Sequence, residues 1–69
     1  MEIGLKIAQY LKENGIKQRF LSEKTGIPES VISDICLGVR KRIDAIELFK
    51  ICKALNVDMI TFMPDEVNL

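Results

Sequence analysis

The chain has 69 residues, 48% of them apolar, and its ten basic and ten acidic side chains give a net charge of zero. This length suits one small domain, and the scarcity of glycine and proline favours packed helices over a β-sandwich or a disordered chain. No apolar run approaches the roughly 20 residues that span a bilayer, and the N-terminus lacks the basic start of a signal peptide. We therefore expect a cytoplasmic protein without a membrane segment.

Apolar spacing predicts a first helix from residue 3 to Asn14 and Gly15, where glycine accepts the left-handed conformation that ends a helix. Its inward side chains are Ile3, Ile7, Tyr10 and Leu11. A second, short helix is expected over residues 17–25, with Phe20 and Leu21 as its apolar members.

A third helix is expected after the turn residue Gly26, with Pro28 at its start, where a missing N–H costs nothing. It runs to about residue 37 with Ile32 and Ile35 facing inward, and Gly38 ends it.

Asp44 and Glu47 form a capping box of the type D-x-x-E, which predicts the start of a fourth helix. Its inward side chains are Leu48, Ile51, Cys52 and Leu55, and Asn56 is suited to its end. Asp58 is expected to cap a last short helix that contains Met59, Phe62 and Met63. Residues 1–63 then form the domain, and residues 64–69 form a tail.

The two cysteines, Cys36 and Cys52, are far apart in sequence and lie among apolar residues. Because the chain has no histidine and no CxxC motif, a zinc site or a redox motif is not indicated. We expect buried, reduced thiols and neither a metal nor a cofactor.

From Ile3 to Phe62, this layout resembles the lambda-repressor/Cro family of XRE-type helix-turn-helix proteins. The residues that carry the resemblance are Ile3, Gly4, Ile7, Gly15, Ile16, Lys17, Gln18, Leu21, Gly26, Ile27, Ile32, Ser33, Ile35, Gly38, Leu48, Ile51, Ala54, Leu55, Val57 and Phe62. The resemblance implies an all-α, five-helix domain whose second and third helices form the helix-turn-helix.

The resemblance also implies roles for exposed residues. The residues matching the family's base-reading positions are Gln18, Glu29, Ser30, Ser33 and Asp34, and Gln18 can meet either the DNA backbone or a base edge. The basic loop after the third helix, with Arg40, Lys41 and Arg42, is expected to bind phosphates, and Lys17 and Arg19 could add to the same face.

The chain departs from the family at two positions that commonly carry an Arg–Glu ion pair. Leu11 and Cys36 stand there instead. Replacing both partners of a buried pair by packed apolar groups is often neutral or stabilising, so we expect Leu11 and Cys36 to form a packing contact. Ser22, where the family favours alanine, is small enough for the crossing of the second and third helices.

The charge pattern leaves two interpretations of the third helix open. Residues 17–42 carry six basic and three acidic side chains, whereas residues 43–69 carry two basic and five acidic ones. A carboxylate can accept a hydrogen bond from the cytosine amino group, but Glu29 could equally be stabilised by its place at a helix N-terminus. Asp34 lacks that explanation, and the cations at 40–42 could also form a merely solvated loop.

Apolar side chains outside the inward faces include Leu5 and Ile46, and scattered exposures of this kind are ordinary. Four others, near the C-terminal end, could form one patch that serves as a two-fold dimer interface: Phe49, Met59, Ile60 and Met63. A dimer would place two recognition helices in successive major grooves of a palindromic operator.

We therefore expect a sequence-specific, double-stranded DNA-binding regulator, a small dimeric repressor of phage or mobile-element type. No acid–base constellation suggests an enzyme. The alternative is a helix-turn-helix scaffold that binds protein, as an antirepressor, inhibitor or antitoxin-like module, and the zero net charge and the acidic third helix favour it.

Overall fold

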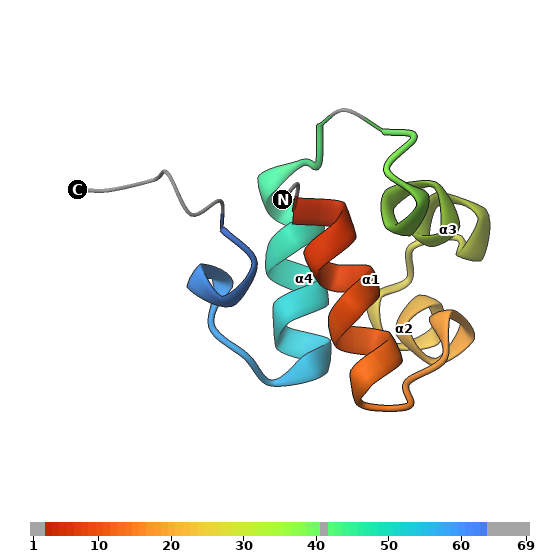
Figure 1. The fold of residues 1–69 in the computed structure, drawn as a ribbon. Helices are drawn as coiled ribbons and strands as arrows, with labels where there is room; N and C mark the ends of the chain where they lie inside the picture. Colours follow the sequence, from red (N-terminus) through yellow and green to blue (C-terminus); the bar gives the residue numbers. More distant parts are fainter. Residues whose placement is uncertain (1–2, 41, 64–69) are drawn as a thin grey trace.

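Four α-helices and one 3₁₀-helix account for the regular structure of the described residues. The computed structural model describes residues 3–40 and 42–63. The elements are α1 (Ile3–Glu13), α2 (Gln18–Thr25), α3 (Glu29–Leu37), α4 (Ala45–Leu55) and the 3₁₀-helix η1 (Met59–Phe62), shown in Figure 1. These ranges hold no strand, and the all-α prediction is confirmed for them.

The fifth predicted helix is a four-residue 3₁₀-helix, so residues 3–40 and 42–63 form four α-helices rather than five. Asp58 lies at its N-cap but its side chain makes no capping hydrogen bond. One turn offers too few i→i+4 hydrogen bonds to favour the α form, and short segments commonly adopt the tighter helix.

Local signals in the sequence set the ends of the helices. Gly26 and Gly38, at φ 77° and 76°, take the left-handed conformation after α2 and α3, and Asn56 takes it after α4 at φ 58°. The predicted capping box is present, because the Asp44 carboxylate accepts from the backbone and the Glu47 side chain accepts from the Asp44 N–H at 3.1 Å.

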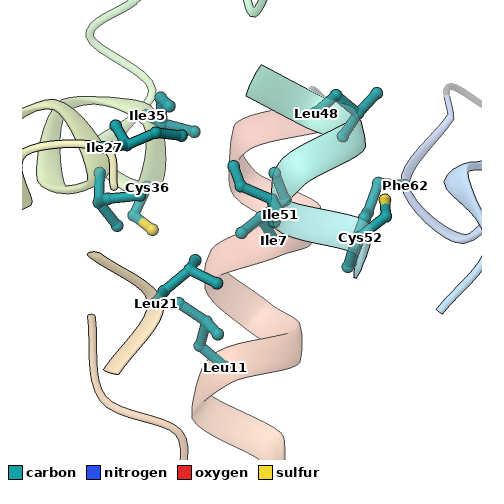
Figure 2. Packing of buried hydrophobic residues seen from close by; sticks show 11 residues of the cluster. Ile7, Leu11, Leu21, Ile27, Ile35, Cys36, Leu48, Ile51, Cys52 and Phe62 are labelled. Atoms are coloured by element: carbon teal, nitrogen blue, oxygen red, sulfur yellow. The ribbon is translucent and has the colours of Figure 1, made fainter. Parts of the chain in front are cut away.

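One apolar core joins all five elements (Figure 2). Its buried members are Ile7, Leu11, Leu21, Ile27, Ile32, Ile35, Cys36, Leu48, Ile51, Cys52 and Phe62. Most of the side chains predicted to face inward are thus buried. Ile3, Tyr10 and Leu55 are only partly buried against the core. Phe20, expected as an apolar member of its helix, is 41% exposed.

Helix α1 packs against α3 on one side and η1 on the other (Figure 1). A Cβ at Gly4 would collide with the Ile35 carbonyl oxygen, so the missing side chain sets how closely α1 approaches α3. On the other side, the Tyr10 and Phe62 rings meet edge to face with centroids 5.6 Å apart, and the Lys6 ammonium donates to the Met63 carbonyl at 2.7 Å.

Both cysteines are free and buried. Burial raises the pKa of each thiol above its ordinary value, which keeps both protonated at neutral pH. Leu11 and Cys36 belong to the same core, and Figure 2 shows both beside Leu21. Two apolar groups therefore occupy the positions where the family commonly has an ion pair, and neither leaves a buried charge.

Candidate nucleic-acid interface

Side-chain hydroxyls hold the turn between α2 and α3. The Ser22 hydroxyl donates to the Ile27 carbonyl. The Thr25 hydroxyl donates to the Leu21 carbonyl at 2.7 Å and accepts from the Ile27 N–H at 3.1 Å. The two bonds to Ile27 satisfy backbone groups that the turn leaves outside the helices. The sequence predicted a role only for the small size of Ser22, and neither hydroxyl bond was predicted, although Ser and Thr near a helix end are a recognisable signal.

One face of α3 points away from the core. Ile32, Ile35 and Cys36 are buried, whereas Glu29, Ser30 and Asp34 are exposed and Ser33 is partly exposed. Leu37, which is 68% exposed, extends the same face by one turn. The four predicted α3 residues therefore share one accessible surface, and no described segment of the chain covers it.

The α2 residues predicted to meet DNA lie at the start of that helix. Gln18 is its first residue and partly exposed, and Lys17, which precedes it, and Arg19 are exposed. Lys17 and Arg19 also line a hollow toward the end of α4, together with Phe20. These two cations therefore border the α4 side of α2 as well as its N-terminal end.

The basic loop after α3 is only partly available for phosphates. The Arg40 guanidinium donates to the Glu47 carboxylate at 3.0 Å, with the two side chains 34% and 23% exposed. This hydrogen bond is the main cause that lowers the pKa of Glu47 and raises that of Arg40. Arg42 is exposed, and Lys41 lies outside the described residues.

The Arg40–Glu47 pair was not anticipated from the sequence. Glu47 was assigned only to the capping box, and in the structure its two oxygens serve both tasks, one accepting from the Asp44 N–H and one from Arg40. Seven residues and an irregular connector separate the partners, so no helical spacing indicated the contact.

The charges around α3 have both signs. Glu29 and Asp34 project from the helix, which carries no basic residue of its own. The negative charge of Asp34 contributes to raising the pKa of Arg40, so the last turn of α3 and the following loop are electrostatically linked. Carboxylate and hydroxyl groups at these positions can accept from base amino groups, and hydroxyls can also donate.

The predicted dimer residues lie on two parts of the surface. Phe49, 53% exposed, lines a hollow between α4 and α2. Ile60, 78% exposed, belongs to η1, and Met59 and Met63 beside it are partly buried against the core. In Figure 1, η1 lies on the side of α4 away from α2.

Two helices joined by a glycine turn, with the second presenting a polar face, define a helix-turn-helix protein. Consistent with this, a family model described as helix-turn-helix matches residues 7–62. The chain therefore belongs to the XRE-type helix-turn-helix family, whose members are DNA-binding regulators, and the resemblance to lambda-repressor/Cro proteins is confirmed.

The comparisons with curated proteins and with solved structures found no match. Within residues 3–40 and 42–63, no three His, Cys, Asp or Glu side chains are grouped to hold a metal ion. In the same ranges, no helix is long and apolar enough to cross a bilayer.

Proposed function

We propose that this protein is a sequence-specific, double-stranded DNA-binding transcriptional regulator without enzymatic activity. It acts in the cytoplasm as a small dimeric repressor of the phage or mobile-element type that the resemblance suggests. The observation that carries the proposal is the accessible polar face of α3, within a helix-turn-helix whose turn is held by the Ser22 and Thr25 hydroxyls.

In this proposal α3 enters the major groove, and Glu29, Ser30, Ser33 and Asp34 meet base edges, with Gln18 beside them. A carboxylate in the groove favours cytosine, whose amino group donates. The phosphate contacts come from Lys17, Arg19, Arg40, Lys41 and Arg42. To contact a phosphate, Arg40 exchanges its bond to Glu47. Where Arg40 keeps that bond, Arg42 contacts the phosphate instead.

A two-fold dimer is proposed through η1, centred on Ile60 with Met59 and Met63 beside it. The exposure of Ile60 supports this contact, since a large aliphatic side chain at 78% exposure gains from burial. Phe49 lies on the α2 side of α4 and is therefore left out of this contact.

The proposal is tested by selecting duplexes from a random DNA pool with the purified protein. It predicts an enriched palindromic motif, and Asp34→Ala should return a changed preference at one position of each half-site. A pool that stays random after repeated selection with folded protein would contradict it.

A second candidate is protein binding through the same α3 face. Its support is specific: Glu29 and Asp34 oppose phosphates, Arg40 is engaged by Glu47, and Leu37 and Val39 are 68% and 66% exposed where the loop would face DNA. In this candidate the protein is an antirepressor, inhibitor or antitoxin-like module, and a partner protein covers α3. A partner whose binding is lost in Leu37→Ala, with no duplex retained at low salt, would favour it.

A further inference from the structure

Two adjacent hollows lie between α2 and α4, and of the residues that line them only Lys17 and Arg19 are also proposed as phosphate contacts. Their volumes are about 580 and 520 Å³, and they share Ala54 as a lining residue. We call the two together the α2–α4 groove. Its α4 residues lie outside the helix-turn-helix, so the α4 side of the groove stays accessible when α3 is engaged.

The groove combines exposed aromatic rings with positive charge. Phe20 on α2 and Phe49 on α4 are 41% and 53% exposed. The cations that line it are Lys17, Arg19, Lys24, Lys50 and Lys53, against the single carboxylate of Glu23. A chain with zero net charge thus places half of its basic side chains along one groove.

Each ring has an ammonium group above it, one helical turn further along. The Lys24 Nζ lies 5.7 Å from the centre of the Phe20 ring, and the Lys53 Nζ lies 5.8 Å from that of Phe49. An occupant that reaches the rings therefore meets a cation beside each apolar contact. This arrangement fits a ligand in which apolar and carboxylate side chains are interleaved.

We propose that the α2–α4 groove binds an acidic amphipathic helix of a partner protein. A groove between two helices, with aromatic side chains along its length, is a common receptor for the apolar face of such a helix. The lysines then pair with carboxylates at the edges of that face, which gives charge selectivity and a faster association. Single-stranded nucleic acid fits less well, because base stacking needs open ring faces and here a cation stands over each ring.

The probe is a fluorescent peptide of leucine and glutamate, with leucines spaced i, i+3, i+4 and i+7 so that a helix carries them on one face. Its comparisons are a scrambled peptide of the same composition and a peptide with lysine in place of glutamate. The proposal predicts anisotropy-detected binding of the first peptide only, weakened by added salt.

The variant is Phe49→Ala combined with Lys50→Glu, which should weaken peptide binding at least about tenfold, a change of about 1.4 kcal/mol. The matched control combines Leu5→Ala with Lys12→Glu, which are exposed on α1 outside the groove and should leave binding unchanged. Lys50→Glu alone, at an exposed position, serves if the double variant does not fold, and should still weaken binding.

Measuring duplex binding separates this inference from the proposed function. Because Phe49 and Lys50 lie outside α2 and α3, the groove variant should still bind duplex DNA. Equal binding of the scrambled peptide, or no loss in the groove variants, would overturn the inference. The inference would also be overturned if a single-stranded oligothymidylate bound the wild type and not the groove variants, while the acidic peptide did not bind at all.

Discussion

Glu47 shows how one side chain can stabilise two parts of the fold. One carboxylate oxygen completes the N-cap of α4 and the other accepts from Arg40, which anchors the connector after α3 to the next helix. The same contact also engages the positive charge of Arg40, which the proposed function names as a phosphate contact.

The lowered pKa of Glu47 predicts a pH dependence of folding. A carboxyl group whose folded pKa lies below its unfolded value, about 4.3 for glutamate, contributes stability above that value and loses it as the pH falls through the folded pKa. The melting temperature should therefore fall less steeply from neutral to acidic pH in Glu47→Gln than in the wild type. The glutamine keeps an oxygen for the cap. Arg40→Gln should make the fall less steep in the same way, because Arg40 is the main cause of the shift. Superimposable curves for wild type and both variants would contradict this.

Thr25 serves both the end of α2 and the turn. In Thr25→Val the Ile27 N–H, which is partly buried, loses its acceptor. An unsatisfied donor of this kind costs about 1–3 kcal/mol, so the free energy of unfolding in urea should fall by about that amount. The matched control is Thr61→Val, at an exposed position in η1, which should change stability little. Equal effects of the two substitutions would refute the role given to the turn.

Among the helices, the sequence predicted the features that depend on residues close together in the chain. The boundaries of α1, α2 and α3 agree with the structure within a residue, because glycines and the periodic apolar residues mark them. The capping box was predicted because its two members are three residues apart on one helix. The exposure of the α3 face was predicted from the resemblance, and Glu29, Ser30 and Asp34 are indeed exposed.

The interactions that the sequence did not reveal are those between elements. No helical period encodes how α2, α4 and η1 pack. The features that depend on this packing are the Arg40–Glu47 pair, the Lys6–Met63 contact and the exposure of Phe20. The four residues predicted as one dimer patch came from two elements, and their separation across α4 required the tertiary structure.

The crossing of α1 and α3 gives a further prediction. Gly4→Ala would normally favour a helix, but here the added methyl group meets the Ile35 carbonyl, and two helices must move apart. We expect a loss of about 1–3 kcal/mol, as for other overpacked interiors, measured by urea unfolding. Lys12→Ala, exposed on the same helix, is the control. A Gly4→Ala protein as stable as the wild type would show that the crossing is not this close.

For the whole molecule, the fold separates three surfaces by chemistry. The α3 face is polar and acidic, the α2–α4 groove is aromatic and basic, and η1 exposes an aliphatic side chain on the other side of α4. A net charge of zero therefore conceals a strongly polarised surface.

The proposed dimer is tested by sedimentation equilibrium. Wild-type protein should sediment as a dimer, and Ile60→Glu should sediment as a monomer that still folds, because Ile60 contributes little to the core of one chain at 78% exposure. Wild-type protein that remains monomeric at high concentration would rule out this interface.

The central claim, that α3 and its flanking cations bind duplex DNA, is tested most directly by measuring affinity for a selected duplex as a function of salt. We predict a linear fall of log K with log salt concentration, and a slope reduced by about 0.9 for each phosphate contact that Arg42→Gln removes. Asp34→Asn should instead change the preferred base and keep the slope. Affinity that is independent of salt, or equal for the selected and a scrambled duplex, would contradict the account.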